Sequence, residues 1–319
     1  MRDKDTKENI IYLIRTALGN NNTYDLPKRT DWERILLLSQ KQGVRGLVYE
    51  ALETIKQKNT DVKAFPQRLQ IMQCYAQTVQ VEKMYAKHLS LTKDIVALWK
   101  KHGIKTIVFK GIAHSRYYPQ PKHREFGDFD CYLIDGQGRC AYKQGNEIAR
   151  KNGLIVDDDW YKHSHIAYKQ LTIENHQFFT SARRGGTDMA LHKYIVKLIG
   201  DGSQLERING TDIYVLPLEA EGLFMLYHSL THFLVEGIKE HDVLHHGGLG
   251  FFQLGLYLVY LGGKLLVGGK HGLTFADQGA DEGELLYEAV RFLAVKFVDF
   301  AGQVSEQGAY LAAVLGAYL

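Results

Sequence analysis

The 319-residue sequence has few cysteines, few prolines and almost no net charge. Its three cysteines, Cys74, Cys131 and Cys140, are odd in number and lack a paired spacing. This excludes a disulfide scaffold and is typical of a reducing compartment. The 39 Lys and Arg residues nearly balance the 36 Asp and Glu residues, which leaves a formal charge of +3. With no basic stripe carrying interleaved aromatics, we expect no nucleic acid as substrate.

Long apolar runs are also missing. The first ten residues are charged and contain no apolar stretch of the kind found in a secretory signal peptide, so we expect a cytoplasmic protein. The apolar stretch 249–267 is interrupted by Gly255, Gly262 and Gly263 and contains Lys264. A membrane-spanning helix needs about 20 mainly apolar residues. We therefore expect no membrane span and predict a packed, glycine-rich helical hairpin there.

Hydrophobic periodicity divides the chain into three predicted regions. Residues 1–103 have helical spacing, with Asp31 placed to cap a helix and Gly103 placed to end one. Residues 104–215 mix strand and helix patterns, which predicts an α/β or α+β core. Residues 216–319 return to helical spacing and become rich in glycine after Gly247.

The core region contains several predicted strands. The β-branched run Ile104–Phe109 follows a helix, which is typical of a buried strand. Residues 128–134 alternate, so that Asp128 and Asp130 share one face. Further strands are predicted at 154–156, 163–171, 176–181 and 188–195.

Two segments of this region carry candidate chemistry. Asp128 and Asp130 point the same way, and two such carboxylates can bind a divalent cation together with phosphate. Gly127 just before them keeps the approach open. The Lys110–Gly111 turn can present backbone N–H groups and one cation to a phosphate. Taken alone, the acids fit a solvated pair on an edge strand better than a metal site, and the turn fits an ordinary strand end better still.

The order of these residues resembles the uncharacterised bacterial nucleotidyltransferase family of the DNA polymerase beta-like superfamily. That family has a KG turn, a YYP run and an R-x-x-G-D-[IVF]-D run, matched here by Lys110-Gly111, Tyr117-Tyr118-Pro119 and Arg124–Asp130. The likeness extends to Asp31-Trp32-Glu33 and Gln42-Gly43-Val44 before the core and to Tyr227–His232 after it.

The resemblance implies an α+β fold, with a small mixed-sheet nucleotidyltransferase core at 104–215 flanked by the N- and C-terminal helical regions. It also implies Mg²⁺, in a two-metal site, and a nucleoside triphosphate such as ATP as substrate. Asp128 and Asp130 would be the metal ligands, and Lys110 and Arg124, with Gly111 and Gly127, would form the phosphate site. The acceptor would be a hydroxyl of a small molecule or of a protein.

The third acid of the family is where this sequence departs. The family places it two residues before a histidine, and in Met189-Ala190-Leu191-His192 that position holds Ala190. Asp188, on the same predicted strand, becomes the candidate third catalytic acid if the strand shifts. The alternative is a degenerate fold that binds a nucleotide or a partner without turnover. Ala190 supports that alternative, as do His241 and His245, which stand where the family often has Arg and Asp.

The chain contains 14 histidines, which raises the question of a transition-metal site. His228 and His232 lie four residues apart on a predicted helix, His241, His245 and His246 form another group, and His163 and His165 form a third. No cysteine lies near these groups, as a structural zinc site usually requires. We therefore favour packing or substrate contact for the histidines.

Overall fold

The structure is a computed structural model that describes residues 3–19, 30–58, 65–181, 186–208 and 210–236. These residues form two compact units. The first unit contains the described residues up to Gln177 together with Asp201–Leu216. The second contains the described residues of Phe178–Gly200 and those that follow from Pro217.

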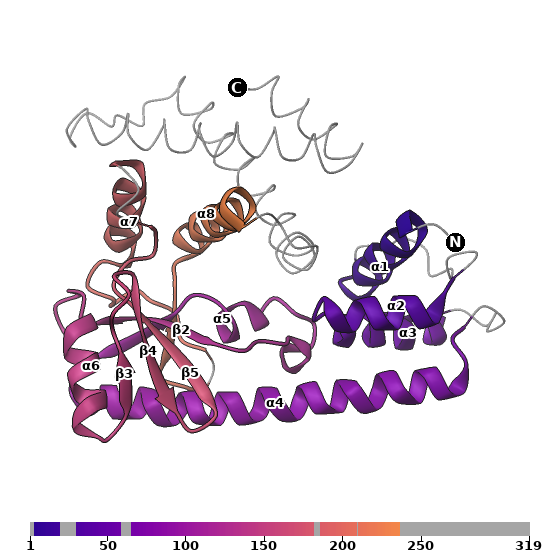
Figure 1. Cartoon of the computed structure of the whole chain (residues 1–319), viewed down its shortest axis with the longest axis horizontal. Helices are drawn as coiled ribbons and strands as arrows, with labels where there is room; N and C mark the ends of the chain where they lie inside the picture. The colour runs from indigo at the N-terminus through magenta and orange to yellow at the C-terminus, as the bar shows by residue number, and fades with distance from the viewer. Residues whose placement is uncertain (1–2, 20–29, 59–64, 182–185, 209, 237–319) are drawn as a thin grey trace. The chain divides into compact units, whose positions relative to one another are not determined.

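The first unit begins with four helices (Figure 1). Helices α1 (Asp3–Ala17), α2 (Trp32–Lys41) and α3 (Arg45–Lys58) pack around a core that includes Ile10, Trp32 and Leu47. Asp31 caps α2, as predicted, since its Oδ1 accepts a 3.1 Å hydrogen bond from the backbone N–H of Arg34.

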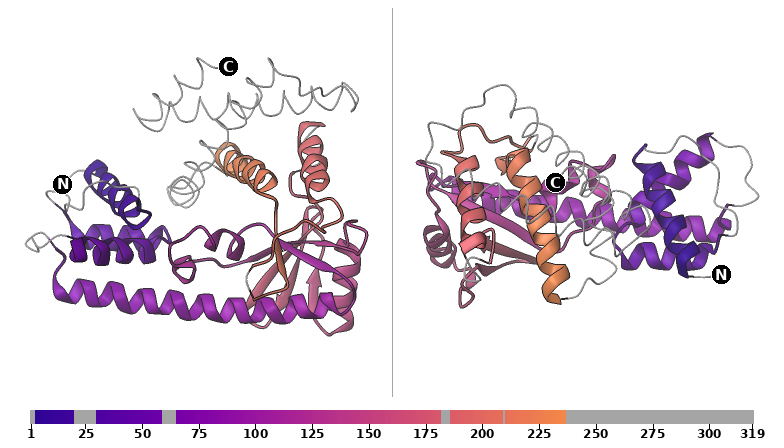
Figure 2. Two further views of the ribbon diagram at one scale, coloured as in Figure 1. Left: turned by 180° about the vertical axis from the view of Figure 1, so that it is seen from behind. Right: turned by 90° about the horizontal axis from the view of Figure 1, so that it is seen from above.

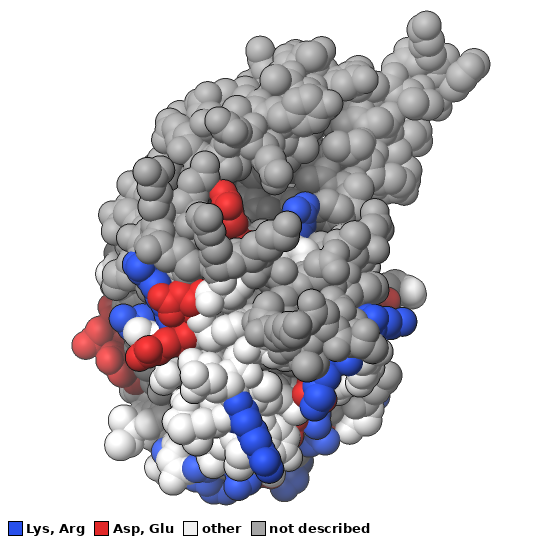
Figure 3. Space-filling view, turned by 90° about the vertical axis from the view of Figure 1, so that its right-hand side faces the viewer, with Lys and Arg blue, Asp and Glu red and all other residues white. Residues whose placement is uncertain are grey.

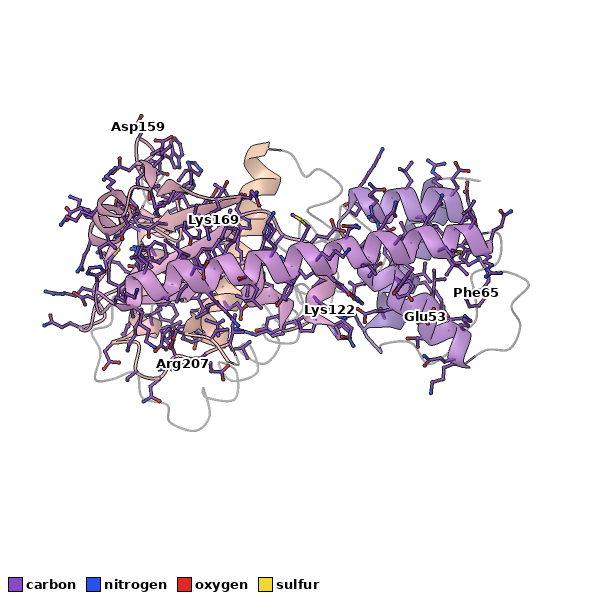
Figure 4. All side chains as sticks on the ribbon, turned by 90° about the horizontal axis from the view of Figure 1, so that it is seen from below. Glu53, Phe65, Lys122, Asp159, Lys169 and Arg207 are labelled. Carbon is purple, nitrogen blue, oxygen red and sulfur yellow. The ribbon has the colours of Figure 1, made fainter. Side chains whose placement is uncertain are left out.

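Helix α4 (Arg68–Lys100) connects this helical region to a sheet. Its 33 residues correspond to about 50 Å at 1.5 Å per residue. Figure 4 shows it running from the helices near Phe65 to the strands. Its last turns place Ile95 and Trp99 in the sheet's core, and Gly103, with φ +75°, ends the segment.

The sheet is mixed and six-stranded, as the α+β prediction requires. Its order is β3-β4-β5-β2-β1-β6. The strands are β1 (Lys105–Val108), β2 (Phe129–Ile134), β3 (Ile155–Asp157), β4 (His163–Tyr168), β5 (Leu171–His176) and β6 (Ile213–Val215). Strands β1–β6 and β2–β5 pair parallel, whereas β1–β2, β3–β4 and β4–β5 pair antiparallel.

Strand β2 lies inside the sheet, and all six of its residues are buried. Alternation sends Phe129, Cys131 and Leu133 into the core beside Trp99 and helix α6 (Tyr142–Lys151). Gly145 permits this approach of α6, because a Cβ there would overlap the Leu133 side chain. The same alternation places Asp130 on the opposite face, which rules out the solvated edge-strand interpretation.

Short elements connect β1 to β2 along the helical side of the unit. Helix α5 (Ile112–Ser115) follows the Lys110–Gly111 turn, and the 3-10 helix η1 (Pro121–His123) packs against α3 and α4. Figure 2 shows the strands beside the C-terminal half of α4 from behind. Figure 3 shows one face on which basic and acidic residues both occur, with uncharged residues between them.

The second unit contains helices α7 (Gly186–Ile199) and α8 (Leu218–Glu236). The strand predicted over 188–195 is wrong, because this segment is part of α7. Its buried residues Leu191, Ile195 and Ile199 recur every four positions, which is the spacing of one helix face. The helix prediction after Pro217 is confirmed by α8.

Two other strand predictions need correction. The predicted strand 163–171 is a hairpin whose turn lies at Lys169 and Gln170, between β4 and β5. Lys169 adopts φ +53°, a conformation that usually belongs to Gly or Asn, so the residue type at this position does not predict a turn. The strand predicted over 176–181 ends at its first residue, because His176 is the last residue of β5.

Within the described part of the chain, no helix has the length and apolar character needed to cross a membrane. The helical hairpin predicted at 249–267 lies outside the described residues.

Candidate active site

The strand register brings acidic residues together on the polar face of the sheet. Asp130 on β2 is aligned with Glu174 on the parallel strand β5. Glu174 is in turn aligned with His165 on the antiparallel strand β4. Because aligned residues of neighbouring strands share a face, the three side chains form a row across the sheet. Lys110, which follows β1, continues the row on the other side of Asp130.

Asp130 is the buried centre of this row, with only 5% of its surface exposed. The Lys110 ammonium donates a 2.6 Å hydrogen bond to its Oδ1, and His176 Nε2 lies 3.2 Å from the same oxygen. Burial acts to raise the pKa of Asp130, but Lys110 and His176 outweigh it and hold the pKa well below its usual value. Burial likewise acts to lower the pKa of Lys110, yet Asp130 raises it. Both groups are therefore ionised at neutral pH.

Glu174 is the acid that sequence reasoning missed. Its Oε2 lies 3.2 Å from His176 Nε2, so His176 connects it with Asp130. Burial acts to raise the pKa of Glu174, but the hydrogen bond with His176 and the Lys110 charge lower it overall. The signal was present, since Glu174-Asn175-His176 also places an acid two residues before a histidine.

The predicted third-acid position therefore needs revision. Ala190 lies within helix α7 rather than on a strand of the sheet, so the absence of an acid there does not indicate a degenerate site. Asp188 lies in the first turn of the same helix and belongs to the second compact unit. Its backbone carbonyl accepts a 2.6 Å hydrogen bond from Thr180. The catalytic role of Asp188 stays a prediction.

Asp128 lies just before β2, and at least a third of its surface is exposed while the rest is covered by neighbouring residues. Partial burial and the charges of Glu174 and Asp130 raise its pKa, although Lys110 opposes this. The carboxylates of Asp128, Asp130 and Glu174 thus repel one another, and among them one ammonium supplies a permanent positive charge. Such a surplus of negative charge is relieved by a bound cation, which makes these acids candidate metal ligands.

The backbone conformation of Gly111 and a hydrogen bond from Arg124 define the Lys110–Gly111 turn. Gly111 has φ +48°, and a Cβ there would lie 3.4 Å from the backbone oxygen of Asp128. Arg124 is buried, and its Nε donates a 3.0 Å hydrogen bond to the Gly111 carbonyl. A Cβ on Gly127 would meet no atom within 4 Å, which agrees with an open approach. Arg124 thus has a positioning role, while its predicted phosphate contact stays a prediction.

Aromatic and imidazole rings surround the acids. His176 packs edge-on against Phe109 with ring centroids 4.9 Å apart, and His163 lies 4.7 Å from His176. Burial and the neighbouring His176 lower the pKa of His163 to about 4, so its imidazole is neutral at pH 7.

Of the other histidine groups, the structure describes the side chain of His228, on helix α8 of the second unit. His228 stacks on Phe224 with ring centroids 5.5 Å apart, which fits the packing role that the sequence favours. His241, His245 and His246 lie outside the described residues. Whether the first two replace acceptor or nucleotide contacts stays a prediction.

A comparison with protein families identifies the family of the chain. A family model described as "Uncharacterised nucleotidyltransferase" matches residues 28–243, which is more than half of the chain. The match covers the site residues from Lys110 to Glu174 as well as helices α2 to α8. The comparisons with curated proteins and with solved structures found no match.

Proposed function

The chain belongs to the uncharacterised nucleotidyltransferase family, and from this premise we propose that it transfers a nucleoside monophosphate from a nucleoside triphosphate to a hydroxyl group. The acceptor hydroxyl belongs to a small molecule or a protein, and Mg²⁺ is required. The observation that supports the proposal is the alignment of Asp130 with Glu174 across β2 and β5, which gathers three carboxylates around one lysine.

The donor set fits a hard divalent cation. Mg²⁺ prefers oxygen ligands and is usually bound by one or two carboxylates together with substrate phosphates. Asp128 and Asp130 offer such oxygens, and Glu174 supplies the third carboxylate. When bound, Mg²⁺ would stabilise the attacking and leaving oxygens of an in-line displacement.

The protein's own residues prepare the site. Lys110 and His176 fix one oxygen of Asp130, which leaves its second oxygen for a ligand. Glu174 is ionised at neutral pH, because its pKa is lowered, and can accept the proton of the acceptor hydroxyl. The acceptor oxygen then bonds to the α-phosphorus, and pyrophosphate leaves. Arg124 holds the Gly111 carbonyl and so keeps Lys110 in place.

The alternative function is nucleotide or partner binding without turnover. Its main support was the missing acid at Ala190, and Glu174 supplies an acid on the strand next to Asp130. Transfer is therefore the better-supported function.

The test is transfer of label from α-³²P nucleoside triphosphates with Mg²⁺, to the protein itself and to small molecules and proteins of a cell extract. We expect wild-type transfer and a fall of about 100-fold or more for Glu174→Gln, equivalent to about 2.7 kcal/mol in the barrier. Asp159→Asn, which removes an exposed acid (labelled in Figure 4), is the matched control and should transfer normally. A wild-type protein that binds Mg–ATP yet labels no acceptor would support the binding alternative.

A further inference from the structure

The two histidines of β4 lie beside Glu174 on the polar face of the sheet. His165 is aligned with Glu174, and His163 is aligned with His176. Their Nε2 atoms lie 3.5 Å and 3.9 Å from the same oxygen, Glu174 Oε1. The other oxygen, Oε2, is the one that lies 3.2 Å from His176. Each oxygen of the Glu174 carboxylate therefore has its own set of neighbours.

Hydrogen bonding does not account for this convergence. A distance of 3.9 Å is too long for a hydrogen bond, and 3.5 Å is at its limit. His163 Nδ1 is buried and has no hydrogen-bond partner among the described residues. One ligand atom from each of His163, His165 and Glu174 nevertheless lies within 4.8 Å of the others, as ligands around one ion must.

The donor set also differs from that of a magnesium site. Two imidazole nitrogens and one carboxylate oxygen suit Zn²⁺, Co²⁺ and similar first-row ions, whereas Mg²⁺ prefers oxygen. Three protein ligands leave further coordination positions open. His165 is about half exposed, with 46% of its side-chain surface accessible, so an ion can enter from solvent.

From this geometry we propose that His163, His165 and Glu174 bind a divalent transition-metal ion. The ion would occupy the β4 side of the row, and Lys110 lies on the opposite side of Asp130. This proposal departs from the sequence interpretation, which favoured packing or substrate contact for the histidines. The site goes beyond the proposed transfer reaction and does not require it, although Glu174 belongs to both.

The test measures the binding of Co²⁺ alone to the full-length protein, by absorbance of the bound ion and by calorimetry. We expect His163→Ala and His165→Ala each to weaken binding by about 10- to 100-fold. His102→Ala, at an exposed position after α4, is the matched control and should bind as wild type. Thermal melting shows whether each variant is folded, and Co²⁺ bound elsewhere survives all three substitutions and is subtracted.

A second measurement separates this proposal from the transfer reaction. His165→Ala should keep the affinity for Mg–ATP within about threefold, and Asp130→Asn should keep Co²⁺ binding while losing Mg–ATP affinity. If folded His163→Ala and His165→Ala variants bind Co²⁺ as wild type does, the proposal is overturned. It is also overturned if His165→Ala loses Mg–ATP affinity but no Co²⁺, because the histidine would then contact the nucleotide.

Discussion

The first unit contains two clusters of ionisable groups that differ in whether their charges are balanced. In the helical region, His123 of η1 lies between two acids, with Nδ1 2.6 Å from Glu50 and Nε2 2.9 Å from Glu82. Lys122, labelled in Figure 4, lies 3.0 Å from Glu82. Two acids thus face one histidine and one lysine, and each ring nitrogen of His123 has a glutamate as its hydrogen-bond partner.

On the polar face of the sheet the balance is missing. Three carboxylates surround Lys110, and the pKa of Asp128 is raised by burial and by the neighbouring acids. The His123 cluster therefore holds as many basic groups as acids, whereas in the sheet cluster three acids face the two basic groups Lys110 and His176. Unbalanced charge of this kind is typical of functional sites, where stability is given up for binding or catalysis.

Asp128→Asn has the largest expected effect on activity. Removing this proposed metal ligand should lower transfer by about 100-fold or more, equivalent to about 2.7 kcal/mol. The midpoint of thermal unfolding, measured without metal, should stay unchanged or rise, because one repelling charge is lost. A large drop in this midpoint would show that the sheet cluster is structural, like the His123 cluster.

His123→Ala is expected to lower stability and to leave transfer unchanged, the reverse of Asp128→Asn. It leaves Glu50 and Glu82 without their shared partner, which should cost about 2 kcal/mol of unfolding free energy in urea denaturation. Transfer per folded molecule should remain near the wild-type value. His102→Ala serves as the exposed control and should unfold like wild type. Equal stabilities of the two variants would contradict a structural role for His123.

Gly145→Ala tests the core face of the same sheet. The added Cβ must displace the Leu133 side chain, which should cost about 1–2 kcal/mol of unfolding free energy. Gly136→Ala, where a Cβ would meet no atom within 4 Å, is the matched control. Unchanged stability of Gly145→Ala would mean that α6 does not need this close approach.

The smallest effect is the pH dependence of the His123 cluster. Burial acts to lower the pKa of His123, but Glu50 and Glu82 outweigh it and raise the pKa. The stabilisation is therefore complete below the unfolded pKa of about 6.5 and is lost as pH rises through the folded value. The difference in unfolding free energy between wild type and His123→Gln should shrink from pH 6 to pH 9. A difference that grows over this range would contradict the assignment.

Local features are predictable from the sequence, whereas features that depend on strand pairing are not. The Asp31 cap and the Gly103 helix end are encoded within a few residues, so spacing alone was sufficient. The Asp128–Asp130 pair became a candidate site only through the family resemblance. Glu174 reaches Asp130 only because β5 pairs parallel with β2, a contact between residues 44 positions apart that periodicity does not contain.

The wrong strand assignment over 188–195 explains why Glu174 was not among the predicted site residues. Two segments resemble the family's run in which an acid stands two residues before a histidine. Glu174–His176 contains the acid, whereas Ala190–His192 has alanine in its place. Matching the family's third-acid strand to Ala190–His192 predicts a strand over 188–195, although the apolar residues of this segment recur every four positions, as on a helix. The turn at Lys169 added to the error, since without it β5 and its glutamate are hidden in one long predicted strand.

The central claim is that Glu174 completes a magnesium–nucleotide site with Asp128 and Asp130. It is tested most directly by the affinity for a non-hydrolysable ATP analogue in the presence of Mg²⁺, measured for Glu174→Gln and Asp188→Asn. We expect at least about a 10-fold loss for Glu174→Gln and a change below about twofold for Asp188→Asn. Wild-type affinity in folded Glu174→Gln, with a large loss in Asp188→Asn, would contradict the claim and restore Asp188 as the third acid.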